Sequence, residues 1–442
     1  MKDREVAVYA LMDIFEQEGY NNIVLRRTFK KYADLTSVQK AFITELVNGT
    51  LRNLILIDYV IGKFSKTKTK KMKPLILNIL RISVYQFIFM DKVPVSAVCN
   101  EAVDIAKKRG FRGLSGFVNG VLRNISKNVD NVDYPDIKND FSGYVSVKYS
   151  YPKWIIDYWL ESLTKDEVMQ MCEQNGKAPN VTAVVNTLKT TSDELISLLE
   201  KDGVGVEIVA DFDNMLYIKR ISDISENDSY KNGLFHIMDK SSFLAIKELA
   251  PVENEKIIDV CAAPGGKSFL SAYFMNNKGS ISSRDVYEHK INLISQGADR
   301  LGIDIINAEI KDASENYEED FKTADRVIVD APCSGLGLVR KKPDIKYSKT
   351  YDDIIELVKI QRDILSASQN YVKNNGFLLY STCTVSYKEN QENVEWFLNN
   401  FDFELVSQNQ ILPQNFDSDG FFIAKFKRKA NWKWVKKLIF YL

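Results

Sequence analysis

Three of the five cysteines in the sequence follow apolar runs of the type that forms β-strands. The runs and their cysteines are Ile257–Val260 with Cys261, Val327–Asp330 with Cys333, and Leu378–Ser381 with Cys383. In a parallel α/β sheet the carboxyl ends of the strands share one edge, and ligands bind at that edge. We therefore expect these cysteines to lie at a ligand-binding edge.

Two of these cysteines have neighbours that suit covalent chemistry. Cys333 lies three residues after Asp330, and Cys383 is flanked by hydroxyl side chains. A lone cysteine is more often a small buried hydrophobe. A thiolate can also add to an electron-poor ring that a neighbouring carboxylic acid protonates. Combined with a nucleoside cofactor, a thiolate and an acid indicate methylation of a pyrimidine carbon.

A glycine-containing loop between a predicted strand and a predicted helix favours a nucleoside ligand. Pro264-Gly265-Gly266-Lys267 lets the backbone approach a ligand closely, but it matches neither the dinucleotide nor the ATP phosphate-loop pattern. Asp285 follows Lys267 by 18 residues, where acidic residues in such folds hold ribose hydroxyls. S-adenosylmethionine suits this pattern, and the alternative is a tight turn with a surface aspartate.

The segments that carry these motifs alternate between strand and helix from Phe235 onward. The alternation predicts a mainly parallel, doubly wound sheet. A last, antiparallel strand is predicted over Asp419–Phe426. The predicted parallel strands are 256–260, 280–284, 305–309, 326–330 and 376–381.

The chain before Phe235 divides into two further parts. The first 130 residues have helical periodicity, and an Asn-, Asp- and Ser-rich linker follows over 128–142. A small α+β module comes next, with predicted strands at 181–185 and 204–209 and a helix at 192–201. The predicted domains are 1–140 (all-α), 141–235 (α+β), 236–430 (α/β) and 431–442 (a cationic, aromatic tail without an assigned role).

Composition limits the classes of function. The chain has 442 residues and equal numbers of basic and acidic side chains, so overall charge gives no indication of nucleic-acid binding. It has no Cys-x-x-Cys pair and only two histidines, His236 and His289, so we expect no disulfide framework and no metal. No apolar run is long enough for a membrane span and no signal peptide is evident. We expect a cytoplasmic monomer.

Local basic clusters could bind RNA phosphates, although such runs are more often solvated surface. The aromatic side chains near Trp154 and Trp159 could stack on bases, but at helical spacing they are more often core. The clusters are Lys63, Lys66, Lys68, Lys70, Lys71 and Lys73; Lys107, Lys108, Arg109 and Arg112; and Arg340, Lys341 and Lys342.

Three motifs in order resemble those of RNA cytosine-C5 methyltransferases. They are Asp-Val-Cys-Ala-Ala-Pro-Gly-Gly-Lys at 259–267, Asp-Ala-Pro-Cys-Ser at 330–334 and Ser-Thr-Cys-Thr at 381–384. The helical region ending in Val118–Arg123 resembles the NusB-like RNA-binding domain. Together these features resemble the RsmB type, which methylates a cytosine of small-subunit (16S) ribosomal RNA. The resemblance implies a Rossmann-like catalytic domain that uses S-adenosylmethionine.

The resemblance also implies roles for single residues. Cys383 would add to C6 of the cytosine, Asp330 would hold the ring nitrogen and amine, and Cys333 would assist product release. Asp285 would face the ribose of the cofactor and Asp312 its adenine. The remaining cofactor-binding residues would be Cys261, Ala262, Ala263, Pro264, Gly265, Gly266 and Lys267, together with Asp330.

Three departures and two alternatives accompany this resemblance. The tail after residue 430 has no counterpart in the family. The predicted strand 280–284 is unusually polar for a buried strand, and Tyr287 stands where the family commonly has an acidic residue. The same chemistry on transfer RNA or on another ribosomal site is one alternative. An RNA-binding assembly factor without turnover is the other.

Overall fold

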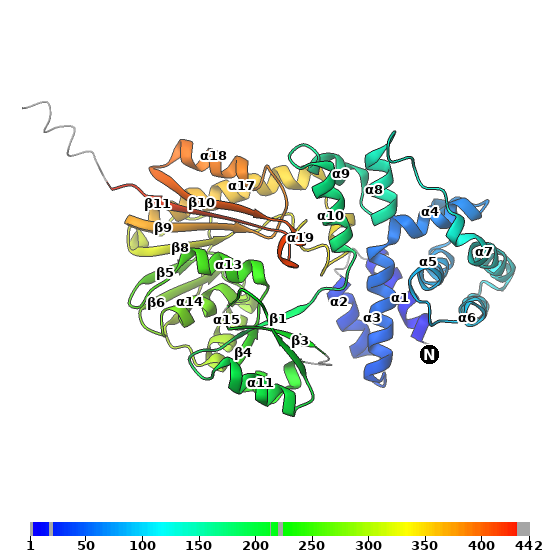
Figure 1. Ribbon diagram of the computed structural model, residues 1–442, viewed down its shortest axis with the longest axis horizontal. Helices are drawn as coiled ribbons and strands as arrows, with labels where there is room; N and C mark the ends of the chain where they lie inside the picture. Colours follow the sequence, from blue (N-terminus) through cyan, green and yellow to red (C-terminus); the bar gives the residue numbers. More distant parts are fainter. Residues whose placement is uncertain (1–2, 17–20, 213, 220–223, 431–442) are drawn as a thin grey trace, which may run out of the picture. The chain divides into compact units, whose positions relative to one another are not determined.

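A computed structural model describes residues 3–16, 21–212, 214–219 and 224–430 of the chain (Figure 1). The cationic tail predicted at 431–442 lies outside the described residues. The chain forms two compact units, Met1–Lys177 with Val339–Ser348, and Ala178–Leu338 with Lys349–Leu442. The boundaries predicted after residues 140 and 235 stay predictions.

The first unit is helical in its described part, as predicted. One large apolar core joins helices α1 to α7, because stripes such as Val8 and Leu11 on α1 face inward. The elements are α1 (Asp3–Glu16), α2 (Asn21–Lys31), α3 (Ser37–Arg52), α4 (Leu54–Phe64), η1 (Thr69–Lys71), α5 (Pro74–Phe89), α6 (Val95–Lys108), η2 (Arg112–Leu114), α7 (Ser115–Asn128), η3 (Val129–Asn131), α8 (Phe141–Tyr149), α9 (Lys153–Trp159), α10 (Lys165–Asn175) and α16 (Ile345–Ser348).

Sequence signals at helix ends have the expected structural effect. Thr36 accepts a hydrogen bond from the Gln39 backbone, and the Gln39 side chain accepts one from the Thr36 backbone. This capping box begins α3. Gly110 follows the end of α6 by two residues and has a φ of +86°, a left-handed conformation that suits glycine.

The basic segment Val339–Ser348 packs inside the first unit, which corrects one expectation. Arg340, expected to bind RNA, is 4% exposed, and its Nε donates to the Lys177 carbonyl at 3.3 Å. Lys346 is also buried, with its Nζ donating to the Arg52 carbonyl at 2.8 Å. Burial lowers the pKa of Lys346 to about 7. Lys341 and Lys342 remain exposed.

The second unit begins with a small antiparallel sheet. Its strand order is β2-β3-β1-β4, and α11 packs on it through Leu195 and Leu199. The predicted β1, β2 and α11 are confirmed, whereas β3 and β4 escaped prediction. The elements are β1 (Val181–Val185), α11 (Ser192–Lys201), β2 (Gly205–Ile208), β3 (Met215–Lys219), η4 (Ile224–Glu226), α12 (Asp228–Lys231) and β4 (Phe235–Ile237).

A larger sheet follows, with strand order β10-β11-β9-β8-β5-β6-β7. Strands β5 to β9 are parallel to one another. β11 pairs antiparallel with β9, and β10 pairs antiparallel with β11. The predicted doubly wound fold and last antiparallel strand are confirmed, and β10 was missed. The strands are β5 (Lys256–Asp259), β6 (Ser280–Asp285), β7 (Ile306–Ile310), β8 (Ala324–Asp330), β9 (Val372–Thr382), β10 (Phe403–Ile411) and β11 (Phe421–Arg428).

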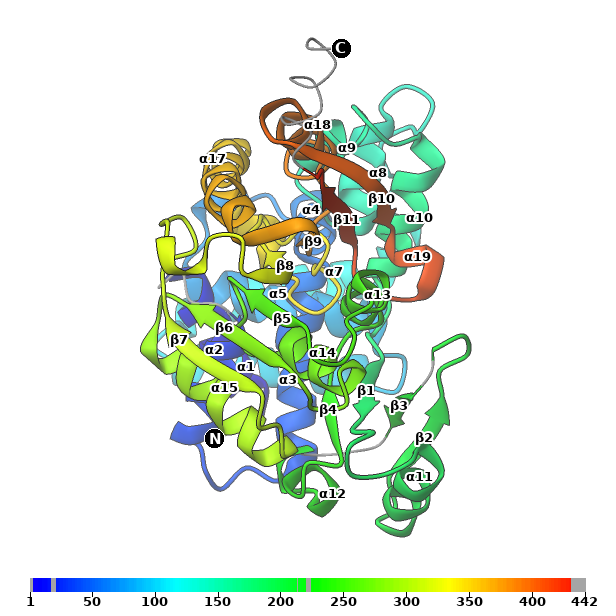
Figure 2. The same cartoon turned by 90° about the vertical axis from the view of Figure 1, so that its left-hand side faces the viewer.

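Both faces of this sheet are covered by helices (Figure 2). Successive strand residues point to opposite faces, so Ile257 packs toward α13, α14 and α15, whereas Ile258 packs toward α17 and α18. The helices and short helical turns of this part are α13 (Lys240–Leu249), α14 (Gly266–Phe274), α15 (Glu288–Leu301), η5 (Glu318–Asp320), α17 (Tyr351–Ser368), η6 (Gln369–Tyr371), α18 (Gln391–Asn400) and α19 (Pro413–Phe416).

The strand order reverses beside β5. From β5 the chain continues to β6 and β7 on one side, and then returns to β8 and β9 on the other. Ligands of doubly wound sheets bind outside the carboxyl ends of the strands at such a switch point. The motifs that end β5, β8 and β9 therefore meet where the fold favours a binding site.

Candidate active site

Asp330, the last residue of β8, has both carboxylate oxygens held by donors. The Ser381 hydroxyl of β9 donates to Oδ1 at 2.7 Å, and the Lys267 ammonium donates to Oδ2 at 2.7 Å. Lys267 lies in the first turn of α14 and is only 8% exposed. A charge-assisted hydrogen bond is stronger than a neutral one, and a donor on each oxygen limits rotation of the carboxylate. The Asp330 carboxylate therefore has a fixed orientation.

The structure brings the two predicted reactive cysteines together. Cys333 Sγ lies 3.2 Å from Cys383 Sγ, because β8 and β9 are parallel neighbours with Asp330 opposite Ser381. The pKa of the Cys333 thiol is raised well above its ordinary value. Its hydrogen bond with Cys383 is the largest cause, followed by burial and by the charges of Cys383 and Glu389.

The glycine loop after β5 turns sharply into α14. Gly265 has a φ of +111°, and a Cβ at this position would collide with the Phe269 ring. The Ala262 backbone N–H donates to the Arg284 carbonyl at 2.8 Å, which ties the loop to the neighbouring strand β6. The glycine is therefore required by the shape of the loop.

Two cavities meet at this loop, and both are lined by Cys261, Ala263 and Asp330. The larger cavity has a volume of about 380 Å³ and the smaller one about 260 Å³. Predicted residues that line only the larger cavity are Asp285 and Asp312. Those that line only the smaller cavity are Ala262, Pro264, Gly266, Lys267 and Cys383. Gly265 and Cys333 line neither cavity.

The two predicted cofactor carboxylates are oriented by different partners. Asp285 accepts a hydrogen bond from Lys290 Nζ at 3.3 Å. Asp312 accepts hydrogen bonds from the Ser314 hydroxyl and backbone N–H, and these bonds lower the pKa of its carboxyl. Both side chains line the larger cavity, which can accommodate a nucleoside with its hydroxyl groups toward Asp285.

Asp259 is a site residue that sequence reasoning missed. It is the last residue of β5, is fully buried and lines the smaller cavity. Its Oδ2 accepts from Ser268 at 2.8 Å, and its Oδ1 has no hydrogen-bond partner among the described residues. Burial raises the pKa of Asp259 to about 7. Its position two residues before Cys261, at the start of the first motif, was the available signal.

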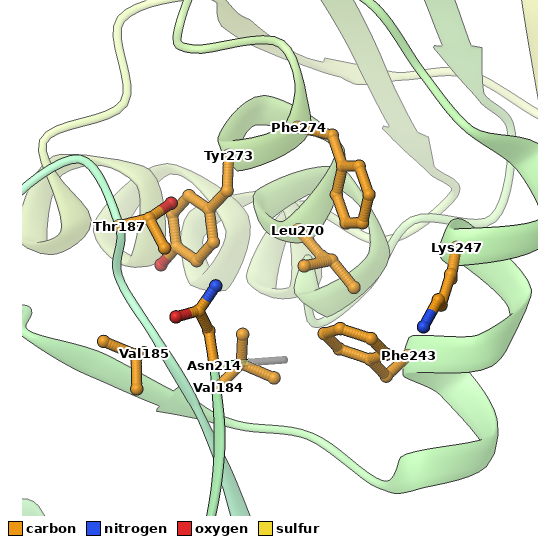
Figure 3. A pocket seen from close by; sticks show the side chains of 9 residues that line it. All are labelled: Val184, Val185, Thr187, Asn214, Phe243, Lys247, Leu270, Tyr273 and Phe274. Carbon is orange, nitrogen blue, oxygen red and sulfur yellow. The ribbon is translucent and has the colours of Figure 1, made fainter. Parts of the chain in front are cut away.

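A third cavity, of about 270 Å³, lies between the small sheet and helices α13 and α14 (Figure 3). Phe243, Phe274 and Leu270 form an apolar side, whereas Asn214 and Thr187 lie toward Tyr273. Its lining contains none of the predicted catalytic or cofactor-binding residues. This cavity is therefore separate from the two that meet at Asp330.

The two N-terminal basic clusters differ in their surroundings. The six lysines from Lys63 to Lys73 are exposed, and no carboxylate among the described residues lies within ion-pair distance of them. In the second cluster, Arg109 donates to Glu5 at 2.6 Å and lies over the Tyr9 ring. The first cluster is therefore the better candidate for phosphate binding.

Neither a membrane span nor a metal centre is apparent in the described part of the chain. A search of its helices found none with the length and apolarity needed to cross a bilayer. No group of three or more His, Cys, Asp or Glu side chains within residues 3–430, apart from the stretches not described, could hold a metal ion.

Three family models match successive parts of the chain. Residues 246–427 match the model of the 16S rRNA methyltransferase RsmB/F. Residues 1–127 match the NusB family, and residues 151–225 match the ferredoxin-like domain of RsmF/B-like methyltransferases. The expected resemblance is thus confirmed along the chain.

Individual relatives agree with these models. The chain is 37% identical to the probable ribosomal RNA small subunit methyltransferase B of Bacillus subtilis, with 97% of this chain and 99% of the relative covered. The solved structure named PH0851 has a TM-score of 0.80 at 26% identity and covers 97% of this chain and 99% of its own. A methyltransferase homologue from Pyrococcus horikoshii has a TM-score of 0.58 at 26% identity, covering 64% and 97%.

Proposed function

The chain belongs to the RsmB/F family of 16S rRNA methyltransferases, and we propose that it transfers a methyl group from S-adenosylmethionine to C5 of a cytosine in small-subunit ribosomal RNA. One observation carries the proposed chemistry. The sulfurs of Cys333 and Cys383 lie 3.2 Å apart, at the strand ends where the oriented carboxylate of Asp330 also lies.

The target cytosine is proposed to enter the smaller cavity, which Cys383 and Asp330 both line. Such a base has to leave its stack, so we expect a single-stranded or loosely paired site. The Cys383 thiolate adds to C6, and Asp330 holds the ring nitrogen and the exocyclic amine. The added electron density makes C5 nucleophilic, and C5 takes the methyl group while its bond to the donor sulfonium breaks.

The residues of the two cavities fit S-adenosylmethionine. Asp285 would accept hydrogen bonds from the ribose hydroxyls, and Asp312 would lie near the adenine in the larger cavity. The Cys261–Lys267 loop joins this cavity to the smaller one, so the methionine part would lie along the loop. The unpartnered Oδ1 of Asp259 supports this placement, because a buried acceptor needs a donor such as an ammonium group. When bound, the cofactor supplies an electrophilic methyl group.

Cys333 is proposed to act when the product is released. The C5 proton passes to solvent, the C5–C6 double bond forms again, and the Cys383 Sγ–C6 bond breaks with its electron pair returning to sulfur. Because its pKa is raised, the Cys333 thiol remains protonated and can donate a hydrogen bond to the departing thiolate. Its distance from Cys383 Sγ makes this contact direct.

The proposal is tested by transfer of labelled methyl groups to unmodified 16S ribosomal RNA. We expect label at one cytosine C5, no label with Cys383→Ala, and a covalent RNA adduct that survives denaturation with Cys333→Ala. Label on transfer RNA only would change the substrate and keep the chemistry. Binding of the cofactor without transfer to any RNA would favour the assembly-factor alternative.

The proposed substrate also determines the setting in which the enzyme works. The Bacillus subtilis relative is named as a probable ribosomal RNA methyltransferase, and for an enzyme of this kind we propose a cytoplasmic location. A monomer remains our prediction for the oligomeric state, and sedimentation of the purified protein would test it.

A further inference from the structure

A buried carboxylate lies behind the two cysteines. Glu389 is fully buried, in the connection between β9 and α18. Its Oε1 accepts hydrogen bonds from the Ser334 backbone N–H at 2.8 Å and from Gln361 Nε2 at 3.1 Å. Its Oε2 accepts a hydrogen bond from the Ser334 hydroxyl at 2.6 Å. Both oxygens are therefore occupied by donors from other parts of the chain.

These hydrogen bonds reach both cysteine loops. Ser334 directly follows Cys333, and its Oγ lies 2.7 Å from the Oγ1 of Thr384, which directly follows Cys383. Gln361 also donates to the carbonyl of Pro332, the residue before Cys333, at 2.9 Å. Glu389 thus supports the Cys333 loop on both sides and, through one hydroxyl, connects it to the Cys383 loop.

A carboxylate at position 389 is costly for folding, so its presence needs a reason. Burial of a carboxylate is unfavourable unless hydrogen bonds compensate for lost hydration, and burial raises the pKa of Glu389. Glutamine has nearly the same shape and avoids this cost. It has only one acceptor oxygen, however. Its NH2 group would face either the two N–H donors or the Ser334 hydroxyl, which would then have to accept a hydrogen bond instead of donating one. Only a carboxylate accepts all three hydrogen bonds.

We propose that Glu389 is a positioning residue that holds the Cys333 loop against the Cys383 loop and so keeps the two thiols in contact while the methylated product is released. The effect on product release rests on the proposed function. The effect on the distance between the two sulfurs does not, and it can be measured without RNA.

A trivalent arsenical measures the spacing of the thiols directly. Phenylarsine oxide bridges two nearby thiols by forming two As–S bonds, and its oxygen leaves as water with the two thiol protons. Mass spectrometry of the full chain, followed by peptide mapping, gives the rate at which Cys333 and Cys383 are bridged. We expect Glu389→Gln to slow this bridging by about tenfold, since a displacement of about 1 Å is enough to disturb a reacting pair.

The chain offers a matched control at Glu392, in the first turn of α18. This carboxylate is 38% exposed at the side chain and pairs with Arg362 at 3.1 Å, without contact to either cysteine loop. Glu392→Gln removes the same charge by the same substitution three residues away. We expect its bridging rate to equal that of the unchanged protein.

Kinetics of the RNA adduct separate a positioning role from general loss of structure. With Glu389→Gln we expect the adduct to form at nearly the normal rate and to break down about tenfold more slowly. Loss of the Glu389 charge also removes one cause of the raised pKa of Cys333, so the alkaline limb of the breakdown rate should move to lower pH. Cofactor affinity should not change.

The possible results are distinct. Bridging and adduct breakdown at normal rates in Glu389→Gln would overturn the proposal, and so would equal losses in Glu392→Gln. If Glu389→Gln slows bridging but the unchanged protein methylates no RNA, the positioning role is sustained and the proposed function is refuted. If Glu389→Gln does not fold, Ser334→Ala removes the hydroxyl between Glu389 and Thr384. An unchanged bridging rate in that variant would overturn the proposal.

Discussion

The ion pair between Lys267 and Asp330 yields the most direct prediction about catalysis. Lys267→Met keeps most of the side-chain length and removes the donor that lies 2.7 Å from Asp330 Oδ2. The Ser381 hydroxyl would still hold Oδ1, so the carboxylate could rotate about one remaining hydrogen bond. We expect slower methyl transfer because Asp330 would no longer be oriented toward the cytosine.

The size of the effect follows from the burial of the pair. A hydrogen bond to a charged group contributes about 1.5–3 kcal/mol. The side chain of Lys267 is only 10% exposed but that of Asp330 is 32% exposed, so solvent screening favours the lower end of this range. A loss of about 1.4 kcal/mol in transition-state stabilisation corresponds to a rate about tenfold slower.

The assay is the single-turnover rate of methyl transfer at saturating cofactor, with cofactor affinity measured separately by calorimetry. Lys278→Met is a suitable control, because Lys278 forms a comparable 3.0 Å pair with Glu253 and both side chains are more than a third exposed. Such an exposed pair contributes little. A rate for Lys267→Met equal to that of Lys278→Met would refute the orienting role.

Two further predictions concern stability and RNA affinity. Burial raises the pKa of Asp259 from 3.8 to about 7. The contribution of this carboxyl to the free energy of unfolding is therefore full below pH 3.8 and is lost as pH rises through about 7. The loss amounts to at most about 4 kcal/mol. Asp259→Asn should flatten this dependence in urea unfolding between about pH 5 and pH 8, and an unchanged pH dependence would contradict the assignment. Reversal of the charges at the exposed Lys68, Lys70 and Lys71 should weaken RNA binding and lower its logarithmic salt slope by about 0.9 for each lost phosphate contact. If affinity and slope stay the same, this cluster does not bind phosphates.

Strands were predictable where the sheet is buried on both faces. Runs such as Ile257-Ile258 and Leu378-Leu379 alternate between the two cores, so they are continuously apolar in sequence. β10 was missed because it is an edge strand with mostly exposed side chains, and its sequence resembles a polar loop. β3 and β4 are short strands, and they pair with β1 across long sequence separations that local patterns do not reveal.

Charge in the sequence was less informative than apolarity. The run from Arg340 to Lys346 is typical of a solvated basic surface, yet the residues at both of its ends are buried. Lys346 is stabilised by carbonyl acceptors and by the Tyr151 ring, 4.3 Å from its ammonium group. These partners lie far away in the sequence. A basic run alone therefore cannot distinguish an RNA-binding loop from an internal anchor.

The same limitation applies within the site. The motifs predicted which strand ends carry Asp330, Cys333 and Cys383, because the topology of a parallel sheet brings such ends to one edge. They did not predict that Lys267 pairs with Asp330, or that Glu389 lies behind both cysteines. Those contacts depend on side-chain directions from α14 and from the β9–α18 connection. Only the packed structure determines them.

The unusual polarity of β6 has its explanation in the same site. Arg284 is buried, pairs with Asp320 and lies near the Tyr317 and Tyr371 rings, so its charge has partners. The hydroxyl of Ser283 donates to Ser268 at 2.8 Å, and Ser268 donates to Asp259 at 2.8 Å.

This chain of hydroxyls gives β6 a role beyond packing. An apolar residue at position 283 would suit a central strand better, but Ser268 would then lose its neighbouring hydroxyl while still supporting Asp259. Functional sites are where a sequence is expected to depart from local folding rules. The polar strand is thus understandable as support for the buried carboxylate that lines the smaller cavity. Ser283→Ala should weaken that support without removing the fold.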